Sequence, residues 1–212
     1  MLWSMFQTKR SKGPYIKGLL FFCTNRGVWY NAHSIGILEQ RKIGMAKVYT
    51  VIGGVNGAGK SSLTGVLKKE RDDLGMIIDI DKMASLNGWA PIQAGKQALA
   101  LMANYCERGI SFTQETTLSS HQVGKMVRKV KEHGYEVHLF YVGISSAEEC
   151  LKRIANRVAK GGHDIREEDV RRRFARRFDV LIDILPYCNE AKFYDNENGF
   201  EMIAEYQNGD FM

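Results

Sequence analysis

The sequence predicts an α/β fold in which a central parallel sheet of about five strands is covered by helices on both faces. Short apolar runs typical of strands alternate along the chain with segments whose apolar residues recur every three or four positions. This alternation indicates a parallel sheet, because a parallel connection needs a crossover and the crossover is usually a helix. The expected strands are Val48–Gly53, Met76–Ile80, Ser111–Glu115, Glu136–Val142 and Lys192–Tyr194.

Three segments between these strands carry the apolar stripe of an amphipathic helix. The first stripe consists of Val123, Met126, Val127 and Val130, and the second of Ala147, Cys150, Leu151, Ile154, Ala155 and Val158. The third consists of Val170, Phe174, Phe178, Leu181, Ile182 and Leu185, which predicts one helix over this span.

The composition is that of an ordinary globular protein, and 212 residues suffice for one domain. No apolar run approaches the roughly 20 residues that a membrane-spanning helix needs. The four cysteines are scattered without a C-x-x-C pair. They are therefore expected to be reduced packing residues of a cytoplasmic protein, neither a disulfide framework nor a zinc site.

Residues 1–44 differ from the rest of the chain. They hold seven Lys or Arg and one acid, which accounts for the whole net charge of +6, so residues 45–212 are neutral. They show no helical or alternating apolar period. We expect a poorly structured basic extension, translated from an upstream start codon or serving as a targeting or interaction arm, followed by a kinase domain over residues 45–212. Since the body is not basic, a nucleic-acid partner is not expected.

The segment Gly54–Ser61 matches the phosphate-binding loop pattern G-x-x-x-x-G-K-[ST]. It lies between a predicted strand and a predicted helix, which is the setting that the motif requires. Backbone N–H groups and a helix N-terminus attract an anion there, a lysine reaches the β- and γ-phosphates, and a hydroxyl binds Mg²⁺. This predicts a P-loop NTPase or kinase fold that binds ATP and Mg²⁺. The expected nucleotide-binding residues are Gly54, Asn56, Gly57, Ala58, Gly59, Lys60, Ser61 and Ser62.

Polar residues follow two other predicted strands, at the sheet edge where ligands of open α/β sheets bind. On an extended chain Asp79 and Asp81 share one face, so one is expected to help bind Mg²⁺ and the other to accept a proton from a substrate hydroxyl. A solvated loop pair is the alternative. Glu115, Thr116 and Thr117 suit a hydroxyl-rich substrate, although Thr117 or Ser119 also suits a helix N-cap.

A basic segment around Gly161-Gly162 predicts a helical lid. Most of its charges are expected to form a solvated face. At about 100° per residue, however, Arg171 falls inside the apolar sector of its helix, where a guanidinium needs an anionic partner. Arg157 lies at the edge of the apolar stripe of the preceding helix, and Arg153 lies farther out. Arginines on a lid favour phosphoryl transfer, since this chemistry depends on charge neutralisation.

Taken together, these motifs resemble the zeta-toxin-like kinases. The shared features are the phosphate-binding loop, Ile-Asp-x-Asp, Glu-Thr-Thr-Leu-Ser, Gly134–Val137, and Arg-x-x-x-Arg-Val-x-x-Gly-Gly-His-Asp-Ile, in order from about Lys47 to Asn208. The resemblance implies a kinase that uses ATP and Mg²⁺ to phosphorylate a hydroxyl of a small molecule, such as UDP-N-acetylglucosamine. It also implies an antitoxin partner for those members that act as bacterial toxins.

By position, the resemblance makes Asp81 the catalytic base and Lys60 a catalytic cation. It places Arg157 and His163 in the lid, to which we add Arg171, and it places Asp195 and Asn196 near the adenine. The helix Ala94–Arg108 has no acid before Glu107, whereas larger members carry a sugar-contacting glutamate on this helix. The alternatives are a kinase for a nucleoside, a nucleotide cofactor or an antibiotic, or a nucleotide-binding switch.

Overall fold

The computed structural model describes residues 21–23, 29–31 and 46–212, and the chain divides into two units, Met1–Met45 and Ala46–Met212. In the first unit, strand β1 (Phe21–Cys23) pairs antiparallel with β2 (Trp29–Asn31). The sequence predicted no strand there. The remaining predictions for residues 1–44 lie outside the described residues.

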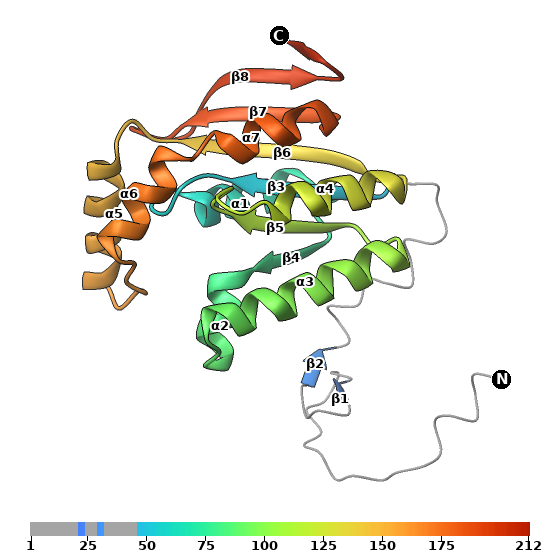
Figure 1. Ribbon diagram of the computed structural model, residues 1–212, viewed down its shortest axis with the longest axis horizontal. Coiled ribbons are helices and arrows are strands. Elements are labelled where there is room, and N and C mark those ends of the chain that lie inside the picture. The colour runs from blue at the N-terminus through green and yellow to red at the C-terminus, as the bar shows by residue number, and fades with distance from the viewer. Residues whose placement is uncertain (1–20, 24–28, 32–45) are drawn as a thin grey trace, which may run out of the picture. The chain divides into compact units, whose positions relative to one another are not determined.

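The second unit is built on a seven-stranded sheet with the order β4-β5-β3-β6-β7-β8-β9 (Figure 1). The neighbours from β4 to β7 pair in parallel, whereas β8 and β9 add antiparallel strands at one edge. The α/β class with a largely parallel sheet is thus confirmed, but the expected number of about five strands is wrong. The strands are β3 (Val48–Gly53), β4 (Met76–Asp79), β5 (Phe112–Thr116), β6 (Glu136–Gly143), β7 (Glu190–Asp195), β8 (Glu201–Gln207) and β9 (Asp210–Phe211).

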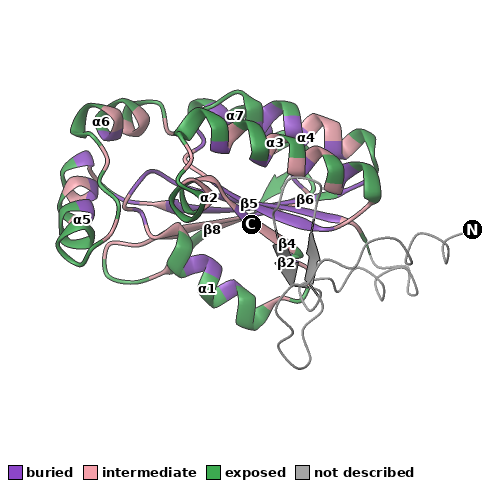
Figure 2. Ribbon diagram, turned by 90° about the horizontal axis from the view of Figure 1, so that it is seen from below, coloured by how far each residue is buried: buried purple, intermediate pink, exposed green. Residues whose placement is uncertain are grey.

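Helices cover both faces of this sheet (Figure 2). Helix α1 (Lys60–Glu70) lies on one face, and α3 (Pro91–Arg108), α4 (Gln122–Glu132) and α7 (Asp179–Ile184) lie on the other. Helices α2 (Ile80–Asn87), α5 (Ala147–Ala159) and α6 (Glu167–Ala175) lie toward the carboxyl ends of the parallel strands (Figure 1). This is the edge where the sequence predicted the ligand site.

The single helix predicted from Val170 to Leu185 is wrong. Helix α6 ends at Ala175, α7 begins at Asp179, and a 3₁₀ turn covers Leu185–Tyr187. Arg177 occupies the break, where its guanidinium donates to the Phe174 carbonyl (2.7 Å) and lies over the Phe174 ring. The backbone N–H of Arg177 donates to the same carbonyl at 3.3 Å, so Arg177 closes the end of α6 with both its backbone and its side chain.

A hydrophobic core lies on each face of the sheet. The larger cluster joins the sheet to α3, α4 and α7 and includes Met102, Phe112, Leu118 and Ile184. The other lies under α1 and α5 and includes Ile52, Leu63, Phe140 and Ile154. Close packing on both faces fixes the strands, so that the loops at their carboxyl ends have a defined geometry. Among the described residues, no helix is both long and apolar enough to cross a bilayer.

Charged residues form a network after helix α1. Arg71 donates to Asp73 at 2.6 Å and to Glu190 at 3.1 Å, and its NH2 lies 3.0 Å from the His138 ring. Hydrogen bonding to Arg71 lowers the pKa of Asp73. The network joins the α1–β4 connection to β6 and β7.

Candidate active site

The loop Gly54–Gly59 turns sharply between β3 and α1. Gly59 precedes the helix at φ 105°, a left-handed conformation that glycine adopts without strain, and a Cβ there would clash with the Asn196 amide. Asn56, Gly57, Gly59, Lys60, Ser61 and Ser62 line one wall of a cavity of about 480 Å³. The predicted residues Gly54 and Ala58 belong to the loop but are not among the lining residues.

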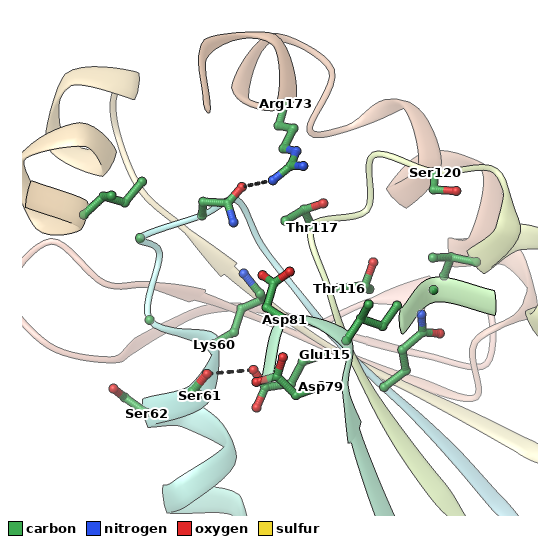
Figure 3. Close-up of a pocket in the computed structure, with 18 of the residues that line it drawn as sticks. Lys60, Ser61, Ser62, Asp79, Asp81, Glu115, Thr116, Thr117, Ser120 and Arg173 are labelled. Atoms are coloured by element: carbon green, nitrogen blue, oxygen red, sulfur yellow. Dashed lines mark hydrogen bonds between the residues drawn. The ribbon is translucent and has the colours of Figure 1, made fainter. Parts of the chain in front are cut away.

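Lys60 lies at the centre of this site (Figure 3). Its Nζ donates to the Val55 carbonyl at 3.1 Å, which holds the side chain against the loop. Burial lowers the pKa of Lys60. Three nearby carboxylates raise this pKa: Glu115 has the largest effect, followed by Asp81 and then Asp79. The loop lysine and the predicted strand-end acids are therefore close in space.

Glu115 contacts the start of α1. Its two carboxylate oxygens accept hydrogen bonds from the hydroxyls of Ser61 (2.8 Å) and Thr64 (2.6 Å), as Figure 3 shows for Ser61. The register Ile52↔Glu115 between β3 and β5 positions it beside the phosphate-binding loop. The sequence prediction placed Glu115 with the substrate, but its contacts are with the nucleotide loop.

Asp79 and Asp81 both line the cavity, although not for the reason predicted. Strand β4 ends at Asp79 and α2 begins at Ile80, so the two residues do not share an extended segment. Asp79 is the N-cap of α2 and accepts from the Lys82 N–H at 3.0 Å, while Asp81 lies in the first helical turn. Figure 3 shows Asp79 near Glu115 and Asp81 near Lys60.

The lid arginine predicted at position 171 is outside the cavity. Arg171 is 47% exposed and binds Glu148 at 2.6 Å and Glu167 at 2.8 Å, which provides the anionic partners that the helical geometry required. Arg173 instead reaches the phosphate-binding loop, where its NH1 donates to Asn56 Oδ1 at 2.7 Å (Figure 3). Two further arginines, Arg153 and Arg157, line the cavity from α5.

His163 is exposed and is absent from the cavity lining. Its carbonyl accepts from Arg157 NH2 at 2.6 Å, so its backbone, not its imidazole, holds the lid arginine. Asn196 donates from Nδ2 to the Ala58 carbonyl at 2.7 Å, which ties the β7–β8 connection to the loop. Asp195 accepts from the Glu197 N–H at 2.7 Å and does not line the cavity. Thr116 and Thr117 do line it.

Two comparisons of the sequence with known proteins show what this chain is similar to. An uncharacterized protein of Haemophilus influenzae is 37% identical over 126 residues, which is 57% of this chain and 88% of that protein. The zeta toxin family model matches residues 92–186. Over these residues the chain resembles the zeta toxin family.

Solved structures resemble this zeta-toxin-like chain at the level of the fold. A structure from the PezAT chromosomal toxin–antitoxin system of Streptococcus pneumoniae has a TM-score of 0.57 at 19% identity, covering 82% of this chain and 76% of that chain. A structure of AvrRxo1-ORF1:AvrRxo1-ORF2 with ATP has a TM-score of 0.58 at 17% identity, covering 85% of this chain and 63% of that chain.

Sequence reasoning missed Arg173 in this zeta-toxin-like protein. Relative to Val170, Arg171 lies at about +100° and Arg173 at about −60°, so the two flank the same apolar stripe. The sequence does not indicate which flank faces the loop, because that depends on how α6 packs against α5. The wall formed by Gly95 and Leu99 of α3 was also missed, since Gly95 carries no chemical signal.

Proposed function

We propose that this protein is an ATP-dependent kinase that transfers the γ-phosphoryl group to a hydroxyl of a small molecule. The observation that carries the proposal is the convergence on one cavity of the phosphate-binding loop, three carboxylates and three arginines. Phosphoryl transfer requires positioning and charge neutralisation, and these groups can provide both.

In this proposal Lys60 and the loop N–H groups bind the β- and γ-phosphates. Ser61 and Glu115 present oxygen atoms side by side, with Asp79 nearby. Oxygen donors of this kind fit Mg²⁺, which is usually held by one or two carboxylates together with substrate phosphates. When bound, the ion would neutralise phosphate charge. Asn196 positions the loop through the Ala58 carbonyl.

Asp81 is the proposed general base. It lines the cavity and lies beside Lys60, so its carboxylate faces the place where the γ-phosphate would bind. Asp79 is already engaged as a helix cap, which leaves Asp81 with more freedom to accept a proton. As the acceptor oxygen bonds to the γ-phosphorus, its proton passes to Asp81 and the bond from phosphorus to the β–γ bridging oxygen breaks, releasing ADP.

Arg157 and Arg173 are the proposed lid cations. In the free protein their guanidinium groups donate to neutral oxygens, the His163 carbonyl and the Asn56 amide. A phosphate oxygen offers a stronger, charge-assisted bond. Binding of ATP is therefore expected to draw these two side chains onto the phosphates.

The acceptor is tested by incubating the protein with ATP, Mg²⁺ and a panel of hydroxyl compounds, and identifying phosphorylated products by mass. A UDP-amino sugar, which the family resemblance suggests, belongs in this panel with nucleosides, nucleotide cofactors and aminoglycosides. Formation of a phosphoproduct that depends on Lys60 supports the proposal. Release of phosphate to water alone, with every acceptor present, would instead indicate a nucleotide-driven switch.

An antitoxin partner is a separate proposal, supported by the match of residues 92–186 to the zeta toxin family model. Expression in a bacterial host provides the test: growth arrest that Lys60→Ala abolishes would indicate a kinase-dependent toxin. Equal growth with both forms would count against it.

A further inference from the structure

The charged side chains of the cavity gather near the phosphate-binding loop: Figure 3 shows Lys60, Asp81 and Glu115 close together, and Ser120 farther from them. The cations are Lys60, Arg153, Arg157 and Arg173, and the anions are Asp79, Asp81 and Glu115. Arg173 bonds to the loop at Asn56, and Arg153 is held by Glu149 at 2.8 Å and by the Glu197 carbonyl at 3.1 Å. These contacts keep both arginines on the nucleotide side.

Among the described residues that line the cavity from α3, α4, β5 and the β5–α4 segment, Glu115 is the one charged residue, and it is bonded to Ser61 and Thr64 of α1. Helix α3 contributes Gly95 and Leu99, and β5, α4 and the segment between them contribute Gln114, Thr116, Thr117, Ser120, Gln122 and Val123. Lys96 follows Gly95 but is exposed and does not line the cavity. We call these eight residues the neutral wall.

The β5–α4 part of the neutral wall is fixed in place. Leu118 is fully buried and has φ 52°, a conformation that a non-glycine residue holds only when its surroundings enforce it. Its N–H donates to Thr116 Oγ1 at 3.2 Å, and the hydroxyls of Thr117 and Ser119 lie 2.8 Å apart. Hydroxyls are thus presented at defined positions toward a ligand.

Gly95 leaves room in front of α3. A glycine inside a helix destabilises it by about 1 kcal/mol relative to alanine. Packing does not require this glycine, because a Cβ there would meet no atom within 4 Å. Gly95 and Leu99 are four residues apart, so they lie on the same helix face and line the same cavity. The empty position at Gly95 is therefore space in the cavity beside an apolar side chain.

We propose that the acceptor is an uncharged, hydroxyl-rich molecule about the size of a sugar ring, which binds against the neutral wall with one apolar face on Leu99. Gly95 is the residue that admits it. An anionic acceptor would place its charge against this wall without a counter-ion, and an unpaired charge is costly to desolvate. This inference rests on the proposed kinase activity and names the chemical class of its substrate.

The first experiment compares each neutral acceptor with its phosphorylated form, such as N-acetylglucosamine with N-acetylglucosamine 1-phosphate, and a nucleoside with its monophosphate. The expected result is a kcat/KM at least about tenfold higher for the neutral member of the preferred pair. A preference for the anionic member would overturn the inference. Failure of every acceptor, with Lys60-dependent ATP hydrolysis intact, would instead overturn the proposed kinase activity.

The second experiment fills the space in front of Gly95 with a larger side chain. Gly95→Leu is expected to lower kcat/KM for the acceptor by about 10²-fold and to leave the KM for ATP unchanged, because the new side chain projects into the neutral wall only. Gly65→Leu is the matched control, since Gly65 is also inside a helix, a Cβ there would also meet no atom within 4 Å, and it does not line the cavity. Equal acceptor kinetics in both variants would contradict the role of Gly95.

A third variant keeps the inference testable if Gly95→Leu folds poorly. Gly95→Lys places a cation on the neutral wall and is expected to shift the kcat/KM ratio toward the anionic member of each acceptor pair. An unchanged ratio in a folded variant would show that this wall does not contact the acceptor.

Discussion

Arg173 and Arg171 lie two residues apart in α6, and replacing each in turn tests the lid most sharply. Arg173 reaches Asn56 of the phosphate-binding loop, whereas Arg171 is engaged by Glu148 and Glu167 outside the cavity. We expect Arg173→Gln to lower kcat and Arg171→Gln to leave it nearly unchanged. Glutamine keeps a polar side chain but is shorter than arginine and carries no charge.

The size of the expected loss of kcat in Arg173→Gln depends on how many other cations line the site. A lone arginine that neutralises a transferring phosphoryl group contributes about 10³–10⁵ to kcat. Here Lys60, Arg153 and Arg157 line the same cavity and share that charge. We therefore expect the smaller loss that accompanies removal of one preorganised donor, about 10²–10³-fold, or roughly 3–4 kcal/mol of transition-state stabilisation.

The assay is steady-state ADP release with varied ATP and saturating acceptor, accompanied by thermal unfolding of each variant. Arg173→Gln should lose no more than about 1.5–3 kcal/mol of stability, since its bond to Asn56 is a single hydrogen bond from a charged group. Equal losses of kcat in the two variants, or a loss confined to Arg171→Gln, would refute the assignment of Arg173 to the site.

Four further predictions concern other parts of the molecule. Glu115→Gln should weaken Mg²⁺-dependent ATP binding more than acceptor binding. It should also destabilise the fold by about 1.5–3 kcal/mol, because both hydroxyl contacts lose a charged acceptor and the amide NH2 cannot accept at all. Isothermal titration and thermal unfolding measure the two effects, and a selective loss of acceptor binding would contradict the prediction. Asp81→Asn should lower kcat about 10²–10⁴-fold with little change in ATP affinity. Asp79→Asn should lower kcat less than Asp81→Asn does. If single-turnover rates show the larger loss for Asp79→Asn, Asp79 would be the general base instead of Asp81. Asp73→Asn should reduce stability at neutral pH: the pKa of Asp73 is lowered in the folded state, so its contribution is present above the unfolded pKa of about 4 and is lost as the pH falls through the folded value. The stability difference between this variant and the wild type should therefore shrink in acid, and a constant difference in urea unfolding would disprove the linkage. Removal of residues 1–44 should leave an active kinase with weaker non-specific binding to anions, and loss of activity on truncation would show that the segment is required.

The parts of the fold that the sequence predicted well are those with strong local signals. The phosphate-binding loop follows β3 and opens α1 as expected, because its glycines and flanking apolar residues determine the local conformation. The five predicted strands match β3 to β7 to within about two residues. Strand β8 was missed because the adjacent residues Met202 and Ile203 are both exposed, so no alternation of buried and exposed residues marks it.

The site was predicted less completely, for reasons of tertiary structure. Phe178 is 45% exposed and Ile182 is 68% exposed, so two residues of the predicted apolar stripe do not mark a buried face. Because α6 ends at Ala175, the apolar sector that selected Arg171 was defined partly by residues that lie outside its helix. Asp79 and Asp81 line the cavity as predicted. The argument that placed them on one extended segment failed, because α2 begins between them. Local spacing identified the residue types, but helix breaks decided which side chains face the cavity.

The central claim is that the cavity transfers the γ-phosphoryl group of ATP to a hydroxyl rather than to water. The most direct measurement follows γ-labelled ATP through a reaction with the full chain, Mg²⁺ and the acceptor panel, with Lys60→Ala as the control. We expect label to appear in an acceptor with the wild type and to be absent from every acceptor with Lys60→Ala. Label found only in inorganic phosphate, or equal transfer by Lys60→Ala, would contradict it.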